Sequence, residues 1–214
     1  MIDLQNFLNS LNCLGSEDEL IDYCRKYVLH GTPYIFINRE DEYYDFRKRI
    51  ATNFNISFNE VFITGSAKLG FSPLKEKQFD YESDIDVAIV SNFLYEEIME
   101  SIRCYQMELR KSRRSITTKE IDMYHSFLEY VAIGWIRPDK LPLSFKIQDM
   151  KNNWFDFFQS ISYNKSEVGN YKVSAGVFKS YLCFEHYTMS GFKDLKNSLS
   201  IGVKNAKTNQ PICY

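Results

Sequence analysis

Two spacings of hydrophobic residues recur along this 214-residue chain, and they predict different elements. Apolar positions three and four residues apart predict helices over residues 17–30, 41–54, 92–109 and 118–133. The first helix begins at a capping box, because Glu19 follows Ser16 at the required spacing. Short apolar runs rich in β-branched residues predict strands at Glu60–Thr64 and Ile85–Val90.

Other segments have weaker patterns. Tyr34–Ile37 suits a short strand or a packed loop, and the apolar segment Trp154–Phe158 suits a helix or a strand. Two prolines predict an irregular loop over residues 134–142. Tyr171–Val173 is expected to be a short strand that leads into a helix over residues 174–199.

We expect one domain over residues 1–214, because no repeat, low-complexity segment or linker divides the chain. Helices within residues 1–58 precede the strands, and a helix with a loosely ordered tail occupies residues 174–214. The length is sufficient for a hydrophobic core. The predicted fold class is therefore α/β (α+β).

The composition is that of an ordinary globular protein, with 44% hydrophobic and 25% charged residues. Aromatic residues reach 16%, but they are scattered, which favours core and half-buried positions over a surface that stacks bases. The formal net charge of −2 argues against strong non-specific binding of nucleic acid. It leaves room for a local basic groove.

The cysteines and histidines have no disulfide or zinc pattern. The sequence contains neither Cys-x-x-Cys nor His-x-x-x-His, and its five cysteines are widely spaced: Cys13, Cys24, Cys104, Cys183 and Cys213. This usage favours a reducing cytosol. No window approaches 18 uninterrupted apolar residues and no signal-peptide pattern opens the chain, so we expect a cytoplasmic protein without membrane insertion.

Candidate chemistry is concentrated within residues 61–90. An apolar run ends at Gly65-Ser66, and after a loop Asp84 and Asp86 lead into a second apolar run. Side chains at positions i and i+2 of a strand project from the same face. The two carboxylates can therefore reach the same metal ions.

These residues suit metal-assisted transfer of a nucleotide. Gly65 lets the backbone approach a triphosphate, Ser66 adds a short polar side chain, and a helical turn after them offers free N–H groups. Lys68 adds a nearby cation. Asp84 and Asp86 offer the hard oxygen ligands for two Mg²⁺ ions about 3.5–4 Å apart, which would activate a hydroxyl and neutralise a pyrophosphate leaving group.

Two other sites with related patterns do not fit. Gly65–Gly70 has the glycine spacing of a P-loop, but Phe71-Ser72 follows and the required lysine is missing. Asp84 and Asp86 begin like an EF-hand loop, but Ala88-Ile89 occupies positions that should carry an acceptor and a glycine. The remaining structural alternative is a turn followed by solvated aspartates at the start of a strand.

The combination of Gly65-Ser66 with Ser83-Asp84-Ile85-Asp86 and the apolar Val87–Val90 resembles the signature of the DNA polymerase beta-like nucleotidyltransferase superfamily. The runs Gly65–Ser72 and Ser83–Val90 are similar to those of small bacterial nucleotidyltransferase-domain proteins, some found among phage-defence genes. The similarity covers about 30 residues, from Val61 to Val90.

The resemblance implies a polymerase-beta-like core with a mixed sheet flanked by helices. It also implies dependence on Mg²⁺, with Mn²⁺ as a substitute, and use of an NTP such as ATP or a dNTP. Carried over residue by residue, Asp84 and Asp86 bind metal and are catalytic. The nucleotide-binding positions are Gly65, Ser66, Lys68 and Ser83.

Two features depart from the superfamily pattern. An inserted loop over residues 70–82, with Lys75 and Lys77, adjoins the site as a lid, a substrate contact or an inert segment. Active members usually carry a third carboxylate on a later strand, but residues 171–178 contain no acid. By order along the chain, the candidates for it are Asp149, Asp156 and Glu167. A two-carboxylate enzyme and a degenerate site both stay open.

Basic residues gather in two further regions. They are Arg103, Arg110, Lys111, Arg113, Arg114 and Lys119 in one region, and Lys193, Lys196, Lys204 and Lys207 in the other. The first set suits either a solvated surface or a patch that contacts the phosphates of an oligonucleotide or tRNA, and the second marks the C-terminal region. Arg137 and Asp139 follow Trp135 in a loop that suits contact with a base or ribose. Tyr214 ends the chain, as part of a disordered tail or as an acceptor for self-nucleotidylation.

The leading interpretation is a Mg²⁺-dependent nucleotidyltransferase that transfers a nucleoside monophosphate from an NTP or dNTP to a hydroxyl. The chain looks too small for an ordinary poly(A) polymerase or a typical cyclic-dinucleotide synthase, and the resemblance favours synthesis of a short oligonucleotide signal in antiphage defence. The alternatives are a toxin-type enzyme that modifies tRNA or protein, and a catalytically inactive antitoxin or scaffold. A protein partner encoded nearby is compatible with each. The sequence specifies neither base preference nor oligomeric state.

Overall fold

A mixed four-stranded sheet forms the centre of the computed structural model, which describes residues 2–111, 117–138 and 148–208. In the order in which they pair, its strands are β1 (Val61–Thr64), β4 (Ile85–Val90), β6 (Val173–Phe178) and β5 (Trp135–Ile136). Strand β4 pairs antiparallel with β1 and parallel with β6, and β5 pairs antiparallel with β6. The predicted α/β class with a mixed sheet flanked by helices is confirmed.

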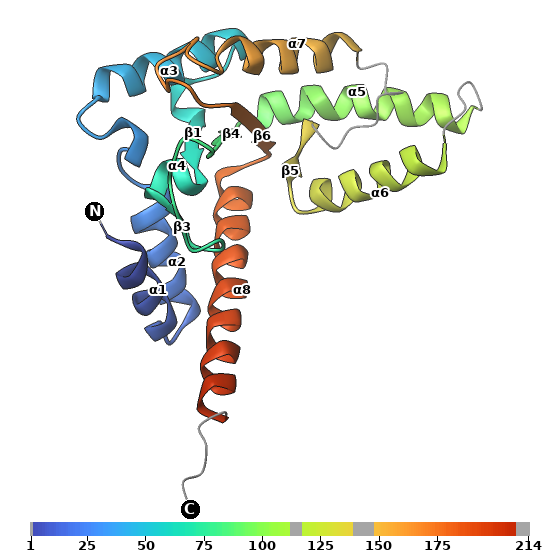
Figure 1. The fold of residues 1–214 in the computed structure, drawn as a ribbon. Coiled ribbons are helices and arrows are strands. Elements are labelled where there is room, and N and C mark those ends of the chain that lie inside the picture. Colours follow the sequence, from blue (N-terminus) through green and yellow to red (C-terminus); the bar gives the residue numbers. More distant parts are fainter. Residues whose placement is uncertain (1, 112–116, 139–147, 209–214) are drawn as a thin grey trace, which may run out of the picture.

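Helices cover both faces of this sheet (Figure 1). They are α1 (Leu4–Cys13), α2 (Glu17–Cys24), α3 (Glu40–Phe54), α4 (Gly65–Leu69), α5 (Asn92–Arg110), α6 (Thr118–Ala132), α7 (Gln148–Ser160) and α8 (Tyr181–Thr208). Shorter elements are the π-turn η1 (Arg25–Leu29), the 3₁₀ turns η2 (Tyr34–Phe36) and η3 (Phe58–Glu60), and a hairpin of β2 (Phe71–Ser72) and β3 (Lys77–Gln78).

Side chains of β4 point alternately to the two faces of the sheet, and the core therefore has two layers. Ile85, Val87 and Ile89 are buried on one face, in a cluster with residues of α3, α5, α6 and α7. Ala88 is buried on the other face, in a cluster with residues of α1, α2 and α8. Asp86 shares this second face, because side chains alternate along a strand. The sheet therefore carries its carboxylate on the side toward α8.

Most strongly periodic segments form the predicted elements. The helices over 41–54, 92–109 and 118–133 correspond to α3, α5 and α6, and strands form at Val61–Thr64 and Ile85–Val90. The capping box of Ser16 and Glu19 is present, with both reciprocal hydrogen bonds. Trp154–Phe158 belongs to α7, and Tyr34–Phe36 forms a 3₁₀ turn rather than a strand.

Several boundaries predicted from the sequence are wrong. Residues 174–178 continue β6 instead of starting a helix, and α8 begins at Tyr181. Trp135–Ile136 forms an edge strand within the segment predicted as a loop. The sequence pattern predicted no helix where α1 forms. Residues 202–208, which were predicted to belong to a loosely ordered tail, are part of α8. In each strand, backbone pairing with a distant segment outweighs the local pattern.

Two further findings on the described part of the chain concern membrane-spanning helices and cysteines. None of its helices combines the length and the apolar character needed to cross a membrane. Cys13, Cys24, Cys104 and Cys183 are all free thiols. Burial raises the pKa of Cys24 to about 12, so this thiol stays protonated at neutral pH.

Gly176 in β6 provides a test of how closely the edge of the sheet packs. A Cβ atom at this position would overlap Nε1 of Trp135 and lie 3.2 Å from the carbonyl oxygen of Ile136. We expect Gly176→Ala to lower the free energy of unfolding by about 1–3 kcal/mol, because overpacking displaces the indole ring. Denaturant unfolding followed by tryptophan fluorescence measures this change.

Gly191→Ala is the matched control, because a Cβ atom at Gly191 in α8 meets nothing within 4 Å. This variant is expected to be neutral or more stable, since alanine is favoured over glycine in a helix. Equal destabilisation of the two variants would contradict the packing of Trp135 on Gly176.

Candidate active site

The candidate site lies where β1 ends and β4 and β6 begin, a part of the sheet that we call the carboxylate edge. Asp84 directly precedes β4 and Asp86 is its second residue. In the pairing register, Thr64 of β1 lies opposite Asp86 on one side and Ser174 of β6 on the other. Three segments distant in sequence therefore meet at Asp86.

The Asp86 carboxylate accepts a hydrogen bond from the Ser174 hydroxyl, with 3.1 Å between Oγ and Oδ1. Asp86 is exposed to solvent. Neighbouring protein atoms still desolvate its carboxylate in part, which raises the pKa of Asp86 above its usual value, and the negative charge of Asp84 acts in the same direction. The Ser174 hydrogen bond and the charges of Arg137 and Lys172 oppose the rise in that pKa.

Gly65 brings the turn after β1 against Asp86. Its φ of +64° lies in the left-handed region, and a Cβ atom there would stand 2.9 Å from Asp86 Oδ2. Helix α4 starts at this glycine, and the side chain of its N-cap residue Thr64 makes no capping hydrogen bond. Ser66 is the second residue of α4 and is half-buried. The structure thus brings Gly65 and Asp86 together, as the sequence pattern suggested.

Lys68 and Ser83 have local partners instead. The Lys68 ammonium donates hydrogen bonds to the carbonyl oxygens of His30 and Gly31, both at 2.5 Å, and the side chain is buried. The Ser83 hydroxyl donates to Asp80 Oδ1 at 3.2 Å and accepts from the Asp80 N–H at 3.1 Å. Lys68 therefore ties α4 to the preceding turn, and Ser83 shapes the turn before Asp84.

Two cations that the carboxylate motif did not identify lie near it. Lys172, immediately before β6, places its ammonium 3.9 Å from Asp84 Oδ2. Arg137, which follows β5, lowers the pKa of Asp86 through its charge. Its guanidinium also lies 5.3 Å from the ring centre of Trp135 and 5.4 Å from that of Tyr130. The sequence suggested a base or ribose contact for Arg137 and gave no role to Lys172.

Three residues were candidates for a third metal-binding carboxylate, and the structure places none of the described ones at the carboxylate edge. Asp156 is exposed on α7, and Glu167 pairs with Arg49 at 2.5 Å. Asp149 belongs to the first turn of α7, where the side chains lie outside the described residues. No cluster of three or more histidine, cysteine or acidic side chains suited to a metal occurs in the described ranges. In the register, the position beside Asp86 is occupied by the hydroxyl of Ser174.

The inserted loop forms the hairpin of β2 and β3. The Lys77 ammonium pairs with Asp80 at 2.8 Å and with Glu82 at 3.0 Å, and these carboxylates neutralise its charge. Lys75 is exposed near the tip. Both lysines are exposed, but the ion pairs of Lys77 shape the hairpin, whereas no ion pair of Lys75 occurs among the described residues.

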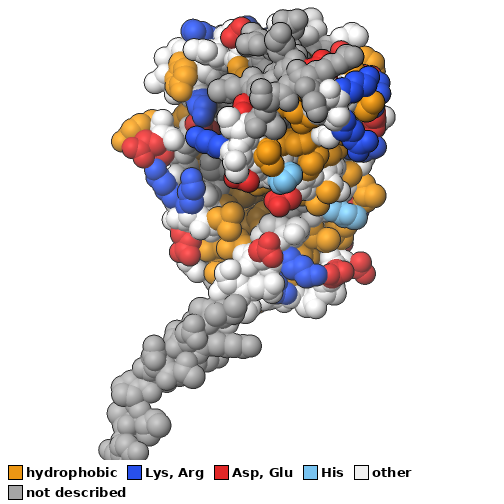
Figure 2. Space-filling view, turned by 90° about the vertical axis from the view of Figure 1, so that its right-hand side faces the viewer, with side chains coloured by type: hydrophobic (Ala, Val, Ile, Leu, Met, Phe, Trp, Pro, Cys, Tyr) orange, Lys and Arg blue, Asp and Glu red, His pale blue; other side chains and the backbone are white. Residues whose placement is uncertain are grey.

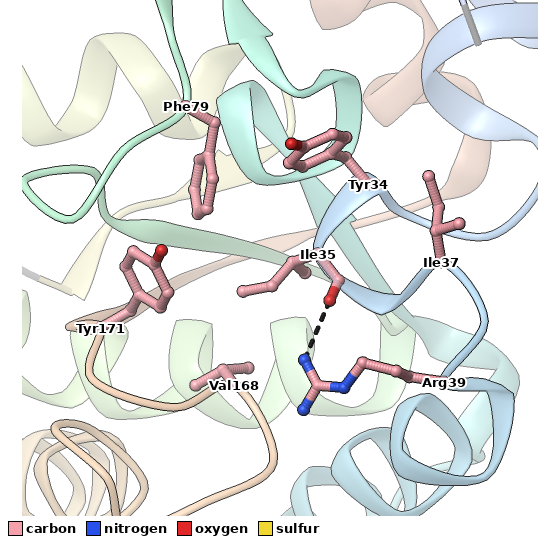
Figure 3. A pocket seen from close by; sticks show the side chains of 7 residues that line it. All are labelled: Tyr34, Ile35, Ile37, Arg39, Phe79, Val168 and Tyr171. Carbon is pink, nitrogen blue, oxygen red and sulfur yellow. Dashed lines mark hydrogen bonds between the residues drawn. The ribbon is translucent and has the colours of Figure 1, made fainter.

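A cavity of about 500 Å³ lies at the other face of the sheet (Figure 3). Tyr171 is two residues before Val173, so it points to the side of Ile85 and away from Asp86. The rings of Tyr34, Phe79 and Tyr171 surround one end of the cavity, and Arg39 stands at the other.

Arg39 does not give this cavity an open positive charge. Its guanidinium donates to Glu42 through two nitrogens, to the Ile35 carbonyl oxygen at 3.1 Å and to the Glu167 carbonyl oxygen at 2.7 Å. A triphosphate would therefore find no uncompensated cation there. The carboxylate edge is the better candidate for phosphate chemistry.

Three described members of the two basic regions have partners, whereas Arg110, Lys111 and Lys119 are exposed. Arg103 pairs with Glu100, and Lys193 pairs with Glu17 at 2.5 Å. Lys196 donates to the carbonyl oxygen of Leu14. On the face drawn in Figure 2, acidic and basic side chains are interspersed with hydrophobic ones. This mixture favours a solvated surface over a phosphate-binding patch.

Some predicted positions fall outside the described residues. They are Arg113, Arg114, Asp139, Tyr214 and the side chains of Lys204 and Lys207. Comparisons with protein-family models, curated proteins and solved structures gave no match.

Gly65→Ala tests whether the close approach of the turn to Asp86 matters. The substitution adds strain at a positive φ and places a methyl group against Asp86 Oδ2. We expect Mg²⁺-dependent binding of a nucleoside triphosphate to weaken by about tenfold or more, because the turn and the carboxylate must separate. Fluorescence titration with a labelled triphosphate measures the binding.

Gly169→Ala supplies the matched control. Its φ of +80° costs similar backbone strain, but a Cβ atom there meets nothing within 4 Å. Its binding should equal that of the wild type. Equal loss in both variants would assign the effect to general destabilisation rather than to the contact with Asp86.

Proposed function

We propose that the protein is a Mg²⁺-dependent nucleotidyltransferase with a polymerase-beta-like core. It transfers a nucleoside monophosphate from an NTP or dNTP to a hydroxyl group. The observation that carries the proposal is the juxtaposition of Gly65 and Asp86, with Asp84 directly before β4 and close enough for its charge to act on Asp86. The turn that could bind phosphate therefore lies next to the two carboxylates that could bind metal.

The donor set at the carboxylate edge suits a hard divalent cation. Asp84 and Asp86 would hold Mg²⁺, and the bound ions would neutralise charge on the phosphates and on the attacking oxygen. The Ser174 hydrogen bond to Oδ1 leaves Oδ2 of Asp86, the oxygen nearest to the Gly65 turn, without a described hydrogen bond. Carboxylate oxygens thus face the turn that would receive the triphosphate.

The remaining residues suit the transfer itself. Backbone N–H groups of Gly65 and Ser66 at the start of α4 can bind phosphate oxygens. A bond forms between the acceptor oxygen and the α-phosphorus, and the bond to the β-phosphate breaks to release pyrophosphate. Asp84 or Asp86 orients the acceptor hydroxyl and accepts its proton. Lys172 and Arg137 place positive charge near the same carboxylates.

The biological role depends on which molecule supplies the hydroxyl that accepts the nucleotide. We propose a short oligonucleotide signal made in antiphage defence, in the cytoplasm, on the strength of the sequence resemblance. A toxin-type enzyme acting on tRNA or protein would use the same donor site. The hydroxyl of Ser174 in the register position beside Asp86 favours, as a third reading, an inactive antitoxin or scaffold.

Incubation with Mg²⁺ and each α-labelled NTP and dNTP tests the proposal. We expect label to enter a short oligomer, and Asp84→Asn or Asp86→Asn to lower incorporation roughly a hundredfold or more, because each variant loses a metal-binding charge. Asp156→Asn is the control, since it removes an exposed carboxylate on α7.

The destination of the label separates the alternatives. Label on added tRNA or on protein would support the toxin-type enzyme. Absence of incorporation together with absence of Mg²⁺-dependent triphosphate binding would contradict both enzymes and support the inactive module.

Ser174 gives a test based on pH. Its hydrogen bond lowers the pKa of Asp86, so Ser174→Ala should raise that pKa. The acidic limb of the pH–rate profile should therefore move to higher pH in Ser174→Ala, whereas Ser174→Thr, which keeps the hydroxyl, should retain the wild-type profile. An unchanged limb in Ser174→Ala would contradict the role of the hydrogen bond.

A further inference from the structure

A second, smaller cavity lies near the end of α4 that is remote from Gly65. Its volume is about 170 Å³, it is open to solvent on one side, and it is lined by residues of η1, the segment after it, α4 and Ile2. The polar side chains in its lining belong to Lys26, His30, Thr32 and Lys68, together with the ring of Tyr27. No aspartate or glutamate lines it among the described residues.

Lys68 is the most unusual member of this lining. It is 5% exposed, and no ion pair to its ammonium occurs among the described residues. The His30 and Gly31 carbonyl oxygens accept two of its three N–H groups. Burial lowers its pKa to about 8, and no neighbouring charge offsets this change. A buried cation without a counter-ion is costly, so an anion in the cavity would stabilise it.

The other side chains reinforce the positive character of the cavity. The Lys26 ammonium lies 5.2 Å from the ring centre of Tyr27, which also lines the cavity, so its position is restrained by the ring. His30 adds an imidazole, and the Thr32 hydroxyl makes no described hydrogen bond to another residue. Two ammonium groups, an imidazole and a hydroxyl are donors suited to an oxyanion.

The volume restricts the size of the ligand. At ~30 Å³ for each water molecule of the liquid, the cavity equals about five or six waters. A phosphate group fits such a space, whereas a drug-sized or nucleoside-sized ligand usually needs a pocket of ~300 Å³ or more. The cavity therefore suits a single phosphate group with the rest of any larger molecule outside.

We propose that this cavity is a binding site for a phosphate group, held by Lys26, Lys68 and Thr32 with His30 at its side. The site is separate from the carboxylate edge, because Lys68 points from α4 toward η1 while Gly65 contacts Asp86. Occupancy would fix the last turn of α4 to the segment of His30 and Gly31. The proposal does not depend on nucleotidyl transfer.

Isothermal titration with inorganic phosphate, at constant ionic strength in chloride and without Mg²⁺, tests the site on the full chain. We expect saturable binding to the wild type. Lys26→Ala and Thr32→Val should each weaken it about tenfold, the size expected for one charge-assisted hydrogen bond. Lys68→Met should abolish binding, but the two partial variants carry the test if this buried substitution prevents folding.

Lys48→Ala is the matched control for Lys26→Ala, since the Lys48 ammonium also lies over a tyrosine ring, 5.7 Å from the centre of Tyr44. It should bind phosphate like the wild type. Absence of binding to the wild type would overturn the proposal. Equal affinities of Lys26→Ala, Thr32→Val and Lys48→Ala would overturn it as well.

A competition experiment distinguishes the two sources of the phosphate group. If 5′-AMP displaces phosphate, and Lys26→Ala weakens both ligands, the cavity accepts a phosphate carried by a nucleotide. If phosphate binds and 5′-AMP does not displace it, the free ion is the ligand. Both outcomes support the site, and neither uses the transfer reaction, so failure of nucleotidyl transfer would leave this test unaffected.

Discussion

The parallel pairing of β4 with β6 is the constraint on which the rest of the structure depends. Its register places Ser174 beside Asp86 and aligns Ile85 with Val173 in the core. A shift of one residue would turn the apolar side chains of β4 toward the carboxylate face and the carboxylates toward the core. The same alternation therefore fixes the two core layers and holds Asp84 and Asp86 at one edge of the sheet.

The sequence predicted the elements whose information is local. Helices α3, α5 and α6 have sustained periodicity, and β1 and β4 are continuous apolar runs. Strand β6 was misread because Ser174, Ala175 and Gly176 are small residues without a strong local preference, and its pairing with β4 decides its conformation. Strand β5 has only two residues, so its pairing with β6 provides the only strong signal.

In the candidate site, too, the residues of a local motif could be predicted from the sequence, whereas those contributed by distant segments could not. The spacing of Asp84 and Asp86 suggested a shared metal site, and the combination with Gly65-Ser66, which resembles a known signature, suggested that Gly65 lies beside them. The contributions of Ser174 and Lys172 arise from the pairing register, which joins segments almost 90 residues apart. For Lys68, the position in the sequence was misleading. Its position near Gly65 in sequence suggested a phosphate contact at the carboxylate edge, but α4 directs it toward η1.

Calorimetric titration with a triphosphate that resists cleavage at the α-phosphorus most directly tests whether Asp84 and Asp86 form a metal-dependent phosphate site. Wild type and Asp86→Asn are compared in Mg²⁺ and in EDTA. We predict that the wild type binds in Mg²⁺ and loses most of its affinity in EDTA, and that Asp86→Asn binds weakly in both. Equal binding by both proteins, with or without Mg²⁺, would contradict a metal site at these carboxylates.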